Sequence, residues 1–171
     1  SDIPIGSYNL IFSKNKYVSS KIANVSVIAN NITQITSVTL EAAPGSISGN
    51  FKLEGEEKHT GITVSVGSHT VQTDDNGEFT LTEIPAGPRT LIATKSGFES
   101  YQAIISLSPG EEFSLDNQTL SFSVGTIKGV SVLQAATNHS GITVSVDGTT
   151  RSTQTNAAGD YQLSGIKQGS Y

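Results

Sequence analysis

Apolar and polar residues alternate along most of the chain in short runs, a pattern typical of half-buried strands. In the run Ile62-Thr63-Val64-Ser65-Val66, the apolar residues share one parity and the polar residues take the other. Turn sequences such as Gly67-Ser68 and Asp74-Asp75-Asn76-Gly77 separate the runs. No window of the sequence has helical periodicity. The pattern therefore predicts an all-β chain of short antiparallel strands.

Residues 47–124 contain about seven such strands, with turn signals every 8–12 residues, which is typical of a small β-sandwich. Because the apolar residues of each strand share one parity, they identify the face that points inward. The predicted core includes Phe51, Ile62, Val64, Val66, Phe79, Leu81, Ile84, Leu91 and Leu107.

The sequence repeats with a period of about 80 residues, which indicates an array of similar modules. Gly61–Val66 returns unchanged as Gly141–Val146, and Gly45–Gly49 resembles Gly125–Gly129. The phase of the repeat predicts tandem seven-stranded antiparallel sandwiches, of which one is complete and two are halves. Three parts are expected: residues 1–46 as a C-terminal half, 47–124 as a complete repeat and 125–171 as an N-terminal half.

Each half alone would expose an apolar sheet face and unpaired strand edges, which favour association. The two halves would lie toward opposite ends of the central module, so we expect each to be completed by an adjoining segment. That segment belongs to a neighbouring copy of the chain or to adjoining repeats of the same polypeptide, and we favour a neighbouring copy over the other end of the same chain. The predicted assembly interface packs Ile142, Val144, Val146, Tyr161 and Leu163 against Leu10, Phe12, Val25, Val27 and Val38.

Composition excludes several classes of function. The chain has no Cys, which rules out disulfides and thiolate zinc sites, and the sequence indicates no cofactor. Its net charge is −5 with no Lys/Arg run, so a nucleic-acid partner has no electrostatic basis. Since no apolar stretch approaches the length of a membrane span, we expect no membrane insertion in this segment. We expect any secretion signal or anchor to lie outside residues 1–171.

Four segments of the central repeat carry a family resemblance: His59–Val64, Thr73–Leu81, Ile84–Gly87 and Lys95–Phe98. In these residues and in their order along the chain, the module resembles the carboxypeptidase regulatory-like domain, a transthyretin-like (prealbumin-like) sandwich. Arg89 departs from the pattern, because Tyr8 and Tyr171 stand at the equivalent places and the family usually has an aromatic residue there. The resemblance implies seven strands, little chemistry, and a role as an appended module of peptidases, outer-membrane transporters, adhesins and other surface proteins.

One acidic segment is a weak candidate for a calcium loop: Asp74, Asp75, Asn76 and Glu78 would offer several oxygen ligands from a short stretch. The downstream copy, Asn156–Gly159, lacks these acids. We therefore favour a structural turn, in which such side chains bond to their own backbone.

The three histidines do not form a catalytic arrangement in the sequence. His59 and His139 occupy equivalent places in two repeats, and we expect each to bond to nearby backbone. His69 is expected on a strand, facing solvent. Without a nucleophile elbow or an evident oxyanion site, the sequence predicts no enzyme.

Four sequons predict candidate glycosylation sites in loops and at exposed strand edges. Their acceptor residues are Asn24, Asn31, Asn117 and Asn138, so glycans are candidate partners.

Together these observations favour a non-enzymatic structural module of an extracellular tandem-repeat surface fibre, stalk or adhesin that assembles head to tail. The alternative is a carbohydrate- or protein-binding accessory module of a secreted or surface protein. Such a module would usually show exposed aromatic residues, for which Tyr101, Tyr161 and Tyr171 are the few candidates.

Overall fold

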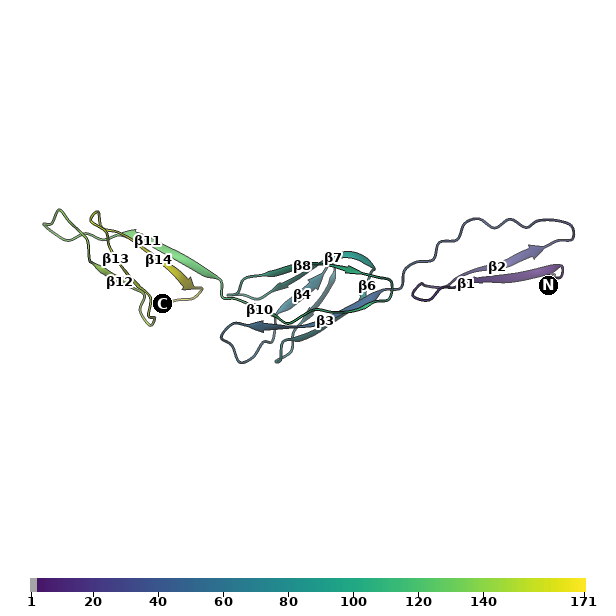
Figure 1. The fold of residues 1–171 in the computed structure, drawn as a ribbon, viewed down its shortest axis with the longest axis horizontal. Coiled ribbons are helices and arrows are strands. Elements are labelled where there is room, and N and C mark those ends of the chain that lie inside the picture. The colour runs from purple at the N-terminus through teal and green to yellow at the C-terminus, as the bar shows by residue number, and fades with distance from the viewer. Residues whose placement is uncertain (1–2) are drawn as a thin grey trace.

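A computed structural model describes residues 3–171, so the first two positions of the predicted segment 1–46 lie outside the described residues. The chain forms three groups of strands in an elongated row (Figure 1). Residues 3–171 contain strands, turns and loops but no helix, and hence no helix long and apolar enough to cross a membrane. The predicted all-β class is confirmed.

The central group forms two sheets that pack face to face. In one sheet the order is β5-β4-β7-β8, and every pairing is antiparallel. In the other sheet β6 lies antiparallel to β3. The eight strands are β3 (Gly45–Leu53), β4 (Thr63–Val66), β5 (His69–Gln72), β6 (Glu78–Ile84), β7 (Gly87–Thr94), β8 (Tyr101–Leu107), β9 (Glu112–Ser114) and β10 (Gln118–Leu120).

The last segments of this module differ from the prediction in direction. Both β9 and β10 run parallel to β3, β9 beside its first part and β10 beside its last part. The expected final strand is thus interrupted by residues 115–117, and eight strands are present where seven antiparallel ones were expected. The period-2 pattern does not carry strand direction, which is why the sequence could not reveal this.

The interior of the central module contains all nine residues of the predicted core. Phe51 is fully buried, and its ring packs against Phe79 at a centroid distance of 5.5 Å and against Tyr101 at 5.4 Å. Five further buried hydrophobic residues were not in the prediction: Ile47, Leu53, Ala93, Ile105 and Leu120. Burial of this apolar set is the main source of the module's stability.

The N-terminal group is a hairpin of β1 (Gly6–Phe12) and β2 (Ser20–Val27), followed by an extended segment that leads to β3. None of residues 3–46 is buried. An isolated two-stranded hairpin is marginally stable at best in water. This half therefore has the strands of a sandwich without a core of its own.

The C-terminal group contains two separate two-stranded sheets, β11 with β14 and β12 with β13. Its buried apolar residues are Val146, Leu163 and Ile166. The strands are β11 (Val124–Val130), β12 (Thr143–Ser145), β13 (Ser152–Gln154) and β14 (Asp160–Lys167). The predicted module boundaries at 46/47 and 124/125 lie just inside β3 and β11, and the three-part division stays a prediction.

The connections on either side of the central module lie at its opposite ends, as expected for a linear array (Figure 1). At one connection the backbone amide of Gly110 donates to the carbonyl of Ala43 at 2.8 Å. At the other, Lys167 Nζ lies 3.3 Å from the centroid of the Phe122 ring, a cation–π contact. Neighbouring groups therefore contact each other directly at both connections.

Candidate assembly surfaces

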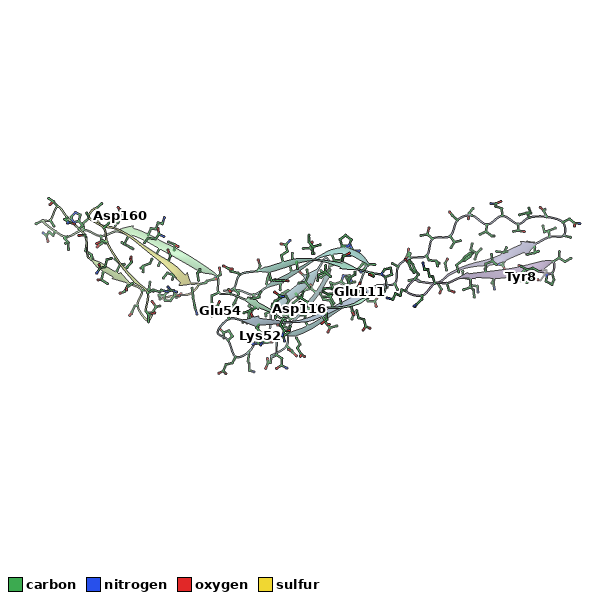
Figure 2. The ribbon with its side chains drawn as sticks, viewed as in Figure 1. Tyr8, Lys52, Glu54, Glu111, Asp116 and Asp160 are labelled. Carbon is green, nitrogen blue, oxygen red and sulfur yellow. The ribbon has the colours of Figure 1, made fainter. Side chains whose placement is uncertain are left out.

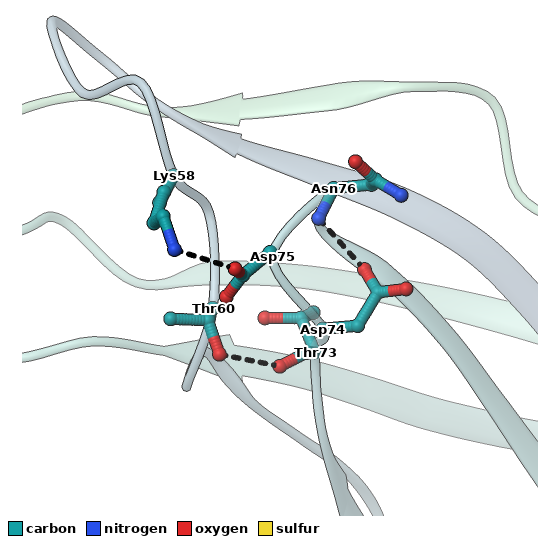
Figure 3. Close-up of polar contacts among 6 residues, drawn as sticks. All are labelled: Lys58, Thr60, Thr73, Asp74, Asp75 and Asn76. Carbon is teal, nitrogen blue, oxygen red and sulfur yellow. Dashed lines mark hydrogen bonds and ion pairs between the residues drawn. The ribbon is translucent and has the colours of Figure 1, made fainter.

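A buried threonine organises the loops at one end of the central module. Thr73 Oγ1 accepts from the Ile62 amide at 3.0 Å and donates to the His59 carbonyl at 2.6 Å, while Thr60 Oγ1 donates to the Thr73 carbonyl at 3.2 Å (Figure 3). His59 Nδ1 in turn accepts from the Leu53 amide at 3.1 Å. This network ties β3, β4 and the β5–β6 connection together.

The C-terminal group repeats the same network. Thr155 Oγ1 accepts from the Ile142 amide at 3.0 Å and donates to the His139 carbonyl, and His139 Nδ1 accepts from the Leu133 amide at 3.1 Å. The expectation that both repeated histidines bond to nearby backbone is confirmed. His69 is different, because it is half-buried at the start of β5 and does not face solvent as expected.

The acidic segment of the central module forms a turn. Asp74 Oδ1 accepts from the amides of Asn76 at 2.9 Å and Glu78 at 2.8 Å (Figure 3). In the downstream copy, Asn156 Oδ1 accepts from the amides two and four residues later, both at 2.9 Å. Because an amide oxygen makes the same bonds, the turn needs an acceptor at this position and no negative charge.

The neighbouring carboxylate has a different partner. Asp75 Oδ2 lies 2.7 Å from Lys58 Nζ, and this hydrogen bond raises the pKa of Lys58 above its ordinary value (Figure 3). Within residues 3–171 no group of three or more His, Cys, Asp or Glu side chains could hold a metal ion. Asp74, Asp75 and Glu78 therefore do not form such a group, and the absence of a calcium site at Asp74, Asp75, Asn76 and Glu78 stays a prediction.

Two surface carboxylates hold backbone at the two ends of the central module (Figure 2). Glu54 Oε2 accepts from the Phe122 amide at 3.1 Å, next to the connection with β11. Glu111 Oε2 accepts from the Ser108 amide at 2.6 Å, and this bond lowers the pKa of Glu111. Both carboxylates thus stabilise the loop backbone by accepting a hydrogen bond from it.

The N-terminal group repeats the end of the central module. Tyr17 and Ala42 form an isolated bridge, as Phe98 and Phe122 do at the equivalent places. Beside the first bridge, the amide after Tyr17 donates to the carbonyl before Ala42 at 2.8 Å, and the matching bond in the central module is also 2.8 Å. This half therefore reproduces the closing part of a sandwich, including the connection to the next module.

The predicted interface residues lie on inward-facing positions of the two halves. Val146 and Leu163 are buried, and the other eight are half-buried: Leu10, Phe12, Val25, Val27, Val38, Ile142, Val144 and Tyr161. Within one copy the two sets lie at opposite ends of the chain (Figure 1). Their packing against each other between copies stays a prediction.

The two halves also have strand edges that are paired in the central module. The β1–β2 hairpin and the β12–β13 hairpin are each two-stranded, whereas their counterparts join into the four-stranded sheet β5-β4-β7-β8. Open edges of this kind present unpaired N–H and C=O groups to another chain. The halves are therefore complementary in hydrogen bonding as well as in apolar surface.

A groove of about 610 Å³ lies on the C-terminal group, lined by residues of β11, β14 and the β13 region. Gly129 and Tyr161 form part of its floor, paired across β11 and β14. In the central module the matching pair is Gly49 and Phe79, and Leu115 covers it. A Cβ on Gly49 would lie 2.9 Å from Leu115 Cβ, so a glycine is needed for this close approach.

The four candidate glycosylation sites are exposed. Asn24 lies on β2, and the other three lie in loops: Asn31, Asn117 and Asn138. Their accessibility fits an acceptor role, which stays a prediction.

Comparison with known proteins places the central module in a family. The family model of the carboxypeptidase regulatory-like domain matches residues 46–121. The central module is a carboxypeptidase regulatory-like domain. No curated protein matches the chain in sequence.

The chain matches several solved structures. The Bacillus anthracis TIE protein matches with 17% identity and a TM-score of 0.50, over 89% of this chain and 30% of that one. A type II cohesin–X-dockerin complex from Acetivibrio cellulolyticus matches with 20% identity and a TM-score of 0.40, over 44% of this chain and 56% of that one. A streptococcal ancillary pilin matches with 12% identity and a TM-score of 0.39, over 98% of this chain and 65% of the pilin chain.

In the segment between β2 and β3, sequence reasoning assigned only Val38 to the candidate surfaces and missed two neighbouring apolar residues. Ile35 and Leu40 are half-buried there and stand 80 positions before Leu115 and Leu120 of the carboxypeptidase regulatory-like domain. The spacing from Val27 to Leu40 equals that of their counterparts in the domain, and this constant offset is the signal that could have found them.

Proposed function

We propose that this chain is a non-enzymatic structural module of an extracellular tandem-repeat surface fibre, stalk or adhesin. Modules would assemble head to tail, with the C-terminal half of one copy completed by the N-terminal half of a neighbouring copy or by an adjoining repeat of the same polypeptide. A head-to-tail contact that does not close on itself propagates as a filament.

One observation carries this proposal. The two ends of the chain repeat the opening and closing parts of the central sandwich, down to individual hydrogen bonds: Thr155 repeats Thr73, and the Tyr17–Ala42 bridge repeats Phe98–Phe122. Each half alone lacks the strands that would cover its inner face. Joined across two copies, the halves contain the counterparts of β3 to β8 and the segment that is equivalent to β9 and β10.

The extracellular location is supported by the family of the central module, whose members occur as appended modules of surface proteins. The chain is rich in Gly, Ser and Thr, and it has neither Cys nor a basic run. These features fit a surface array that does not depend on disulfides or on nucleic acid.

Sedimentation velocity over a range of protein concentrations, with negative-stain electron microscopy of the same samples, tests the proposal. Leu10→Asp places a charge on the inward face of β1 and should abolish assembly, since an unpaired buried charge is costly. Ile11→Asp is the matched control, because Ile11 is the next residue on β1 and is 71% exposed. We expect the unchanged chain and the Ile11→Asp variant to form unbranched threads.

Two results would contradict the proposal. One is an unchanged chain that sediments as a monomer at every concentration, which would favour an accessory binding module. The other is equal assembly of the Leu10→Asp and Ile11→Asp variants, which would show that the inward face of β1 is not used.

A further inference from the structure

The segment between β2 and β3 has the sequence spacing of two strands but does not form them in a single chain. Residues 31–41 contain no strand, whereas the equivalent residues 111–121 include β9 and β10. In Figure 1 the segment runs as an extended trace back toward β3. Its counterparts β9 and β10 have β3 beside them, whereas within residues 3–171 no strand pairs with this segment.

The backbone of the segment begins in the same way as that of its counterpart. Asn30 has a positive φ of 53°, and Gly110 at the equivalent place has a φ of 60°. The next amide donates to the carbonyl three residues back at 3.3 Å in one case and at 3.2 Å in the other. The turn that starts β9 is therefore already formed ahead of the uncovered segment.

The strand that would lie beside this segment is β11. In sequence β11 matches β3 at an offset of 80, and β14 matches β6. In the central module β3 pairs with β6 on one side and with β9 and β10 on the other. On β11 the first of these pairings is present, with β14. The second side, which includes the groove over Gly129 and Tyr161, is not covered by any of residues 3–171.

From this match we infer that residues 32–40 of one copy bind as parallel strands along β11 of a second copy. The inference rests on the proposed head-to-tail assembly and adds its register. Ser48 pairs with Ser114 in the central module, so Lys128 pairs with Gln34 of the second copy. Ile35 then covers Gly129 and Tyr161, as Leu115 covers Gly49 and Phe79.

The other sheet is completed in a register that follows in the same way. In the central module β4 pairs with β7 through Ser65 and Ile92. The equivalent pair between copies is Ser145 on β12 and Ile11 on β1. The inward neighbours in this register are Val146 and Leu10, which agrees with the predicted interface.

Cysteine crosslinking tests the register, because the chain has no Cys of its own. Lys128→Cys protein is mixed with Gln34→Cys protein and oxidised, and disulfide-linked dimers are measured on a non-reducing gel. Both positions are exposed in the single chain, so the variants should fold. Each protein oxidised alone is an internal control, because its cysteines are not placed opposite each other.

The matched control for register is Lys128→Cys with Thr36→Cys, two residues farther along the same face. A shift of two strand residues moves the Cα by roughly 6–7 Å, which takes the pair beyond disulfide reach. We expect about tenfold more linked dimer for the Gln34 pair than for the Thr36 pair. A second pair, Ser145→Cys with Ile11→Cys, should also link, and Ser145→Cys with Asn9→Cys should not.

The outcomes separate the two levels of the proposal. If sedimentation shows assembly but the Lys128–Gln34 pair links no better than the Lys128–Thr36 pair, the parallel pairing along β11 is wrong and head-to-tail assembly stands. If the Ser145–Ile11 pair alone links, the hairpin docks and residues 32–40 do not. If the unchanged chain remains a monomer, the proposed function itself falls.

Discussion

Arg89 donates from Nε to the carbonyl of Pro85 at 2.8 Å, four residues earlier in the chain. Tyr8 and Tyr171 occupy the equivalent places in the flanking halves, and each donates its hydroxyl to the carbonyl four residues earlier, at 2.9 and 2.8 Å. The departure of Arg89 from the aromatic pattern therefore preserves the hydrogen bond. What the repeat keeps at this place is a long side chain with a donor at its end.

Replacing Arg89 by tyrosine should leave the stability of the central module nearly unchanged. Arg89→Ala should lower the free energy of unfolding by about 1 kcal/mol, because it removes the bonds to Pro85 and Ala86 from a half-buried side chain. Urea unfolding of both variants measures the difference. A tyrosine variant as unstable as the alanine variant would show that the guanidinium does more than hold this corner.

Val64→Asp should unfold the central module. Val64 is fully buried between the sheets, and an unpaired carboxylate there costs at least about 3 kcal/mol. Ile104→Asp is the matched control, since Ile104 lies on β8 with 78% exposure. Circular dichroism melting should show a lost or strongly lowered transition for the first variant and a nearly unchanged one for the second.

Calcium should not stabilise the protein. Asp74→Asn should also be neutral, because Asn156 already makes the same turn bonds in the downstream copy. Asp74→Ala should lower the free energy of unfolding by about 1 kcal/mol, because the amides of Asn76 and Glu78 lose their acceptor. Since binding to the native state must raise the melting temperature, a calcium-dependent rise that Asp74→Asn abolishes would overturn this view.

The bond between Glu111 and the Ser108 amide should make a small, pH-dependent contribution to stability. Its pKa is lowered from the ordinary value of 4.5, so the contribution is present above that value and lost as the pH falls through the lower, folded-state pKa. Glu111→Gln should therefore melt slightly below the parent at about pH 7, and the difference should shrink as the pH falls below the ordinary pKa of 4.5. A melting difference that is constant across this range would mean that the charge has no part in it.

The strands of the central module could be predicted from sequence because one face of each is buried. On β3 the buried residues Phe51 and Leu53 are two positions apart, and on β4 so are Val64 and Val66. This even spacing identifies the face of each strand that points inward. The turn at Asp74 was predictable for a similar reason, since its chemistry is local. Both signals lie within a few residues of chain.

The pairing of β9 and β10 with β3 could not be predicted in this way. Parallel pairing joins residues far apart in sequence, such as Ile47 and Phe113, and nothing in the local pattern records the direction. The same limit applies to residues 32–40, whose alternation is weak and whose proposed partner strand lies on a second copy. Only comparison with the central repeat reveals what these residues match.

The chain passes from β10 to β11 through residues 121–123, and both β3 and β11 run close to the long axis of the row (Figure 1). Tension applied to the two ends would therefore act along the strands. The ladder hydrogen bonds of β3 lie across that direction, so pulling would load them together in shear and not one pair at a time. A module built in this way is suited to carry mechanical force along the proposed thread.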